Sequence, residues 1–163
     1  MIEKFINALW SILYIFIGWV LGLLSVEFNF RRTRELEKKK ILQVKVEELV
    51  KLMYELSDEY TQISSEILAY TEVGKEINLK GINANTLLFI RTLITFYFPE
   101  LKTLYEELEG KKKEFSEMIV SWLKKDQAFR KEIAAEIFVK SKEIDKVCEK
   151  VISSSTTIAQ RLL

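Results

Sequence analysis

The sequence predicts an all-α protein, in which a single N-terminal transmembrane helix precedes a cytoplasmic bundle of long amphipathic helices with coiled-coil-like packing. Three observations support this fold class. The 22 residues from Phe5 to Val26 include no Asp, Glu, Lys or Arg. An apolar heptad repeat extends over residues 42–70. Glycine and proline are scarce, at 5 and 1 residues of 163, and these are the two poorest helix formers.

We expect three regions along the chain. They are a membrane anchor at 1–30 with its span at about 5–26, a basic juxtamembrane segment at 31–41, and a cytoplasmic helical bundle at 42–163. The expected helices of the cytoplasmic part cover about 34–72, 86–109 with a kink at Pro99, and 111–160.

The uncharged run from Phe5 to Val26 has the length of a membrane span. At about 1.5 Å per residue it measures about 33 Å, which matches a hydrocarbon core of about 30 Å. A signal peptide is the main alternative, but its apolar region usually covers about 7–15 residues and ends in small residues. Here the chain continues through "LLSVEF" without such a site. The pattern favours a retained anchor.

Basic residues flank the span unequally. Lys4 precedes it, and six basic residues follow it: Arg31, Arg32, Arg34, Lys38, Lys39 and Lys40. Because basic residues close to a span stay on the cytoplasmic side, we expect an external N-terminus and a cytoplasmic C-terminal domain. The single Cys148, which excludes an internal disulfide, agrees with a reducing compartment. The same six side chains are candidates for contact with anionic membrane lipids.

Gly18 and Gly22 lie four residues apart within the span. This G-x-x-x-G spacing allows two helices in lipid to approach closely, although single matches also arise by chance. We take Gly18 and Gly22 as the candidate residues for transmembrane helix packing.

Residues 42–70 form a regular apolar stripe. Its members are Leu42, Val46, Leu49, Met53, Leu56, Tyr60, Ile63, Ile67 and Tyr70, which fill every a and d position of four heptads. The spacing predicts a helix seam. We favour an intramolecular bundle over a free-standing parallel coiled coil, because apolar residues beside the seam widen the face. Any exposed remainder of the stripe is a candidate surface for partner helices.

Residues 71–85 interrupt the repeat and predict a connection, with a short strand-like or helical turn as an option and Asn85 as the N-cap of the next helix. The apolar run 86–98 is too short to span a membrane and contains Arg91, so we interpret it as a core helix. An interfacial helix that touches the membrane is the alternative. Pro99 predicts a kink or two abutted helices, and Gly110 predicts a stop.

The sequence lacks the residues that most enzymes use. It contains no histidine, so the commonest general base and the commonest metal ligand are both absent. No phosphate-binding glycine loop occurs, and Cys148 lies on the apolar side of its expected helix. We therefore expect no enzyme activity, no catalytic or metal-binding residues, no cofactor and no small-molecule substrate. Nucleic-acid binding is not expected either, because Glu35 and Glu37 dilute the basic segment.

Two functional hypotheses remain. The first is a membrane-tethered helical interaction or scaffold protein, which forms a homo-oligomer or docks a protein partner at the cytoplasmic membrane surface. The second is a membrane-perturbing effector or small oligomeric channel that is gated by its cytoplasmic bundle. Uncharged residues in the span favour the first hypothesis, because a water-filled pore usually needs a polar lining.

Overall fold

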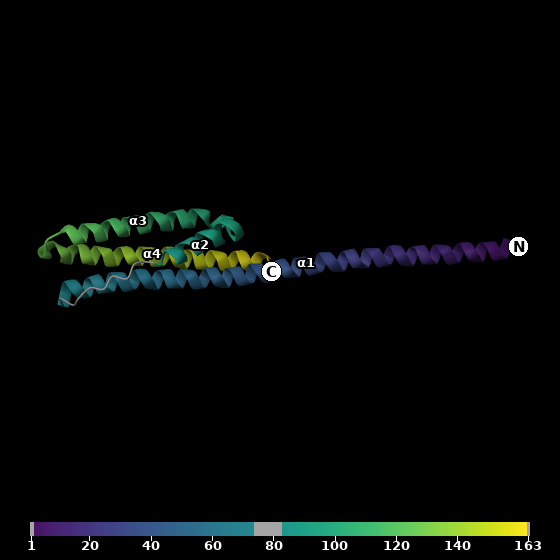
Figure 1. Ribbon diagram of the computed structural model, residues 1–163, viewed down its shortest axis with the longest axis horizontal. Helices are drawn as coiled ribbons and strands as arrows, with labels where there is room; N and C mark the ends of the chain where they lie inside the picture. The colour runs from purple at the N-terminus through teal and green to yellow at the C-terminus, as the bar shows by residue number, and fades with distance from the viewer. Residues whose placement is uncertain (1, 74–82, 163) are drawn as a thin grey trace. The chain divides into compact units, whose positions relative to one another are not determined.

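The computed structural model describes residues 2–73 and 83–162. Within these ranges it does not describe the side chains of residues 2–9, 11, 12, 127, 128 and 162. The described chain is helical and has no strand, which confirms the all-α prediction for these residues. Its elements are α1 (Ile2–Val73), α2 (Ala84–Tyr97), the 3-10 helix η1 (Pro99–Leu101), α3 (Lys102–Lys124) and α4 (Gln127–Leu162) (Figure 1). Chain contacts divide the molecule into two units, residues 1–41 and 42–163, which are described separately below.

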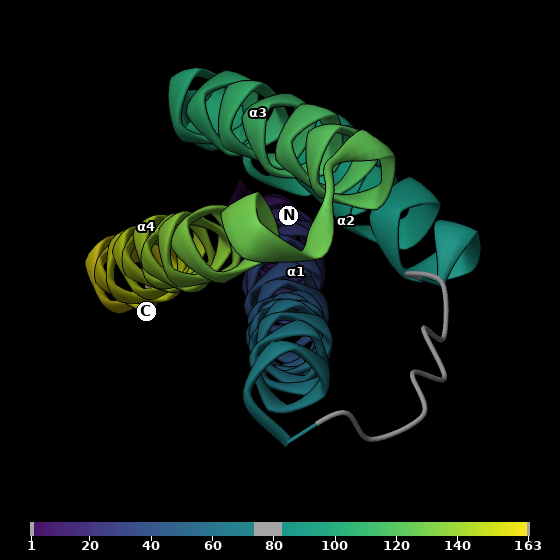
Figure 2. The same ribbon diagram turned by 90° about the vertical axis from the view of Figure 1, so that its left-hand side faces the viewer.

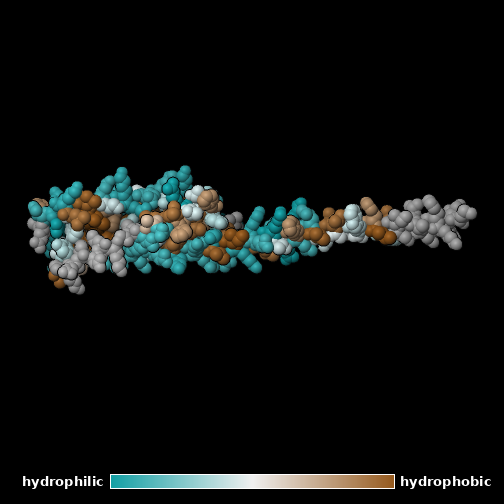
Figure 3. All heavy atoms as spheres, in the orientation of Figure 1, coloured by the Kyte–Doolittle hydropathy of each residue, from teal (hydrophilic) through white to brown (hydrophobic). Residues whose placement is uncertain are grey.

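The N-terminal unit consists of the first part of α1. Within the range searched, which begins at Leu13, α1 contains a segment that is long and apolar enough to cross a membrane by length and composition, and none of that segment is buried. Figure 3 shows brown and pale residues along this unit, followed by the teal residues of the basic segment.

The second unit is a bundle in which α1 and α4 are antiparallel. Ser57 of α1 donates a short hydrogen bond to Asp145 of α4, and the hydroxyl oxygens of Ser64 and Ser141 lie 3.0 Å apart. Both Ser64 and Ser141 are fully buried. Their hydroxyl groups also bond to backbone carbonyls of their own helices, at 2.9 and 2.8 Å. The contact is therefore close, and both serine hydroxyls have hydrogen-bond partners.

A heptad of small residues on α4 makes this close approach possible. The buried residues Ala134, Ser141, Cys148 and Ser155 follow one another at intervals of seven. A second series three residues later, also with intervals of seven, contains the buried Ile137, Ile144 and Val151. Small side chains bring the backbones of two helices together, and the β-branched series fills the space beside them. Coiled-coil packing in the strict knobs-into-holes sense stays a prediction.

Helix α3 lies against both α1 and α4. Its aromatic rings meet rings of α1 edge to face: Phe115 lies 4.9 Å from Tyr60, and Trp122 lies 5.6 Å from Tyr70. The order of these contacts makes α3 parallel to α1. Salt bridges from Lys150 to Glu107 (3.1 Å) and from Lys140 to Glu114 (2.9 Å) make α3 antiparallel to α4. Figure 2 looks along these helices and shows α1, α3 and α4 at three corners.

The short helix α2 occupies the side of the bundle between α1 and α3 (Figure 2). Its inner face buries Ile90, Leu93 and Ile94. It ends at Tyr97 because Pro99 cannot continue the helix, and Pro99 instead begins η1. The expected break at Pro99 is thus resolved as two abutted elements.

Three local expectations differ from the structure. Asn83, not Asn85, is the N-cap of α2, since its side chain accepts a hydrogen bond of 3.0 Å from the Asn85 amide. Gly110 does not end the helix. Helix α3 continues through it to Lys124, because the buried residues beyond Gly110 stabilise the helix. The single helix expected at 111–160 is instead interrupted at Lys125, whose backbone is extended. Of the connection expected at 71–85, residues 74–82 lie outside the described residues.

We predict that Ser141→Leu destabilises the bundle by about 2–4 kcal/mol, because the larger side chain overpacks the α1–α4 contact and removes a hydrogen bond. Thermal unfolding of the full chain in detergent, followed by circular dichroism, should show a fall of several degrees in Tm. The control is Ser153→Leu on the exposed side of α4, which should change Tm little. Equal effects of the two substitutions would show that close approach does not stabilise the bundle.

Candidate functional site

Gly18 and Gly22 face open space within the protomer. A Cβ atom added to either glycine would meet no neighbouring atom within 4 Å. The large apolar side chains near them, including Trp19, Leu21 and Leu23, are exposed. A second apolar helix could therefore pack against this segment without any rearrangement of the protomer.

The six basic residues predicted to contact lipids lie on α1. Two of them make local contacts: Arg31 pairs with Glu27 at 2.7 Å, and Arg34 lies over the ring of Phe30 at 4.3 Å. Arg31, Arg32, Arg34, Lys38 and Lys40 are exposed, and Lys39 is half-buried. The segment thus presents a concentrated positive charge.

The predicted helix seam is used inside the bundle. Seven of its nine residues are buried in the core, and Leu42 and Tyr70 at its two ends are half-buried against that core. Little of the stripe remains exposed for another helix. Any surface for partner helices on the second unit would therefore lie outside this stripe.

The outer face of α2 is apolar and uncovered. Leu88, Phe89 and Phe96 are 60%, 56% and 75% exposed. Thr92 lies between them in the helical repeat, and its hydroxyl donates a 2.8 Å hydrogen bond to the carbonyl of Leu88, so that its polarity is satisfied within the helix. Contiguous exposed apolar surface of this kind typically marks an interaction site.

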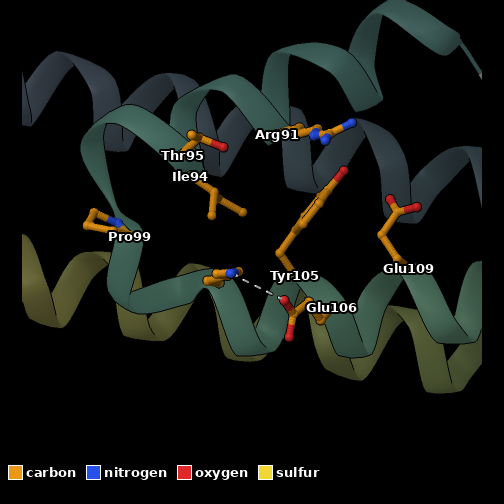
Figure 4. A pocket seen from close by; sticks show the side chains of 8 residues that line it. Arg91, Ile94, Thr95, Pro99, Tyr105, Glu106 and Glu109 are labelled. Atoms are coloured by element: carbon orange, nitrogen blue, oxygen red, sulfur yellow. Dashed lines mark ion pairs between the residues drawn. The ribbon is translucent and has the colours of Figure 1, made fainter.

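A pocket of about 500 Å³ lies between α2 and α3 (Figure 4). It is lined by Arg91, Ile94, Thr95, Pro99, Lys102, Tyr105, Glu106 and Glu109. Figure 4 shows Tyr105 extending from α3 towards Arg91 of α2, with Glu109 beside the two. Lys102 and Glu106 form an ion pair at 3.8 Å on the rim.

Burial and the neighbouring Glu109 carboxylate raise the pKa of Tyr105 to about 12. Its hydroxyl therefore keeps its proton at neutral pH and can act as a hydrogen-bond donor. Tyr60 lies deeper in the same region, and burial with the charge of Glu109 raises its pKa even further. Among the residues that the structure describes, its hydroxyl group finds no hydrogen-bond partner.

Arg130 joins the α3–α4 turn to the end of α1. Its guanidinium donates hydrogen bonds to the carbonyls of Lys125 and Leu123, at 2.9 and 3.4 Å, and lies 5.3 Å from the ring of Trp122. It also reaches the Tyr70 hydroxyl at 3.5 Å. Every one of these contacts stays within the bundle, so we assign the cluster a structural role.

Among the residues that the structure describes, no group of His, Cys, Asp and Glu side chains could hold a metal ion. Cys148 is buried on α4. The absence of enzyme activity stays a prediction.

No known family model, curated protein or solved structure matches the chain. Function must therefore be argued from the residues alone.

We predict that Cys148 reacts very slowly with thiol reagents in the folded protein. Burial raises its pKa to about 12. At pH 8 the thiolate fraction should therefore be about a thousandfold lower than for a free cysteine, in addition to the steric protection. Alkylation by iodoacetamide should become fast on unfolding in denaturant. Rapid modification of the native full chain would show that α4 opens readily from the bundle.

Proposed function

We propose that the protein is a membrane-tethered helical interaction protein, which associates through its span and displays its bundle on the cytoplasmic side. The observation that carries the proposal is the apolar segment of α1, none of which is buried within the structure. About 20 apolar side chains exposed to water would be strongly unfavourable, at about 25 cal/mol per Å². A bilayer removes this cost.

The basic segment that follows the span supports the proposed orientation. Six positive side chains within residues 31–40 favour the cytoplasmic side and attract an anionic leaflet at about 1 kcal/mol each when close to it. The bundle begins at residue 42, directly after this segment. The proposed anchor thus confines the bundle near a membrane surface.

Confinement supplies a mechanism that needs no catalytic group. Two domains tethered to one surface meet at a much higher effective concentration than they do in solution, so weak contacts become sufficient. The open glycine face of the span supports association of protomers. The uncovered apolar face of α2 offers a second contact, to a helix of another protomer or of a partner protein.

Topology tests the tether. Two cysteine variants in a Cys148→Ala background, Glu3→Cys and the exposed Lys131→Cys, are expressed in a bacterial host. In spheroplasts, a membrane-impermeant maleimide should label position 3 at once and position 131 only after permeabilisation. Recovery of the protein in the soluble fraction, or labelling of position 131 in intact spheroplasts, would refute the proposed arrangement.

Self-association tests the glycine face. The double substitution Gly18→Ile and Gly22→Ile should abolish association in a membrane two-hybrid assay, because the added side chains separate the two helices. The protomer itself should be unaffected, since each added Cβ meets open space. Leu24→Ile is a matched control that lies away from the glycine face, and it should keep the signal. An unchanged signal in the double variant would exclude this face as the contact.

A further inference from the structure

The α2–α3 pocket contains polar groups whose bonding capacity is not used by the protein. Within the described part of the chain, Arg91 makes no ion pair, and the Thr95 hydroxyl makes no hydrogen bond. Thr95 differs in this respect from Thr92 one turn away, whose hydroxyl bonds to its own helix. The Tyr105 side chain extends towards Arg91 (Figure 4), and its hydroxyl keeps its proton and is hydrogen-bonded to the Glu109 carboxylate. Two groups with unused donors, the Arg91 guanidinium and the Thr95 hydroxyl, therefore line one opening.

The negative charges of the pocket are already compensated. Glu106 pairs with Lys102 at 3.8 Å, and Glu109 pairs with Lys112 at 2.5 Å. Among the described residues, the guanidinium of Arg91 is thus the lining charge that forms no ion pair. A ligand with a negative group would supply a counterion to Arg91. A cation would instead meet the carboxylates of Glu106 and Glu109, which are already paired with lysines.

The rest of the lining is apolar. Ile94 and Pro99 contribute aliphatic carbon at the end of the pocket where α2 gives way to η1 (Figure 4). A volume of about 500 Å³ falls within the range of small-molecule sites, in which apolar walls surround a few convergent polar groups.

We infer that the α2–α3 pocket binds a small organic anion, namely a carboxylate or phosphate group carried on a short apolar body. Arg91 supplies the bidentate hydrogen bonds that such groups prefer, and the Thr95 hydroxyl supplies a further donor. The apolar body lies on Ile94 and Pro99. This inference goes beyond the proposed interaction role, and it does not require the span to be inserted in a membrane.

Benzoate and benzylammonium are suitable probes, because they share a ring and carry opposite charges. The full chain, with its isoleucine methyl groups labelled, is titrated in phosphatidylcholine nanodiscs while the Ile94 resonance is followed by NMR. Benzoate should shift this resonance with a saturable curve and a Kd of about 1 mM, as befits a fragment-sized ligand. Benzylammonium should produce no saturable shift.

Three variants locate the effect. Arg91→Gln should raise the Kd for benzoate at least tenfold, because it removes the positive charge and the bidentate donor geometry. Thr95→Val should raise it severalfold, because it removes one donor at nearly constant volume. The exposed Lys131→Gln removes one positive charge outside the pocket and should leave the Kd unchanged. Equal weakening by Arg91→Gln and Lys131→Gln, or a non-saturable response in the native protein, would overturn the inference.

The anion could come from solution or from a lipid headgroup, and a change of lipid separates the two sources. With phosphatidylglycerol in the nanodisc, a headgroup ligand would shift the Ile94 resonance before any benzoate is added and would weaken benzoate binding by competition. An unchanged benzoate titration would identify a soluble anion. With either lipid, the inference itself is decided by the charge preference of the pocket, which the comparison of benzoate with benzylammonium tests.

Discussion

The bundle depends on how closely α1 and α4 approach each other. Ser64 and Ser141 meet at 3.0 Å, and each hydroxyl also bonds to a carbonyl of its own helix. Larger residues at these positions would separate the helices, whereas unpaired polar ones would cost about 1–3 kcal/mol each in a dry core. This contact fixes the line along which α3 packs, with Phe115 and Trp122 set edge to face against tyrosines of α1. The small-residue heptad of α4 thus sets the distance between α1 and α4, and the large aromatic side chains fill the space beside them.

The same packing decides what the apolar stripe at 42–70 can do. Seven of its side chains are buried in the bundle, and each contributes about 1.5–3 kcal/mol by leaving water. Their sum exceeds about 10 kcal/mol, which is comparable with the whole stability of a typical domain. A partner helix could not replace these contacts without unfolding the bundle. Any association would therefore use surfaces outside this stripe, and the exposed apolar residues of the span and of the outer face of α2 are two such surfaces.

Periodicity predicted the parts of this fold that depend on local repeats. The α1 stripe follows from spacing within a single helix, and the break at Pro99 follows from the missing amide and the ring of proline. The interruption at Lys125 was missed because the apolar spacing continues across it, although the Asp126 that follows is a residue type favoured before helices. The pocket was missed for a different reason. Arg91 and Tyr105 meet only because the chain turns at Pro99, and no repeat within one helix indicates that juxtaposition. The available signal was Arg91 itself, a charge within an apolar run.

The short length of α2 explains why Arg91 lies in the pocket wall. On α3 and α4, the residues Lys111, Glu114, Lys140 and Glu143 form a network in which each charge has a partner on the facing helix. Helix α2 ends after 14 residues and turns directly into η1, so Arg91 lies in the wall of the α2–α3 pocket and forms no ion pair with a described carboxylate. Solvation makes an exposed guanidinium inexpensive to keep in this state, and its donors then remain available to a ligand. The proline that ends α2 thus helps to place Arg91 in the wall of this pocket.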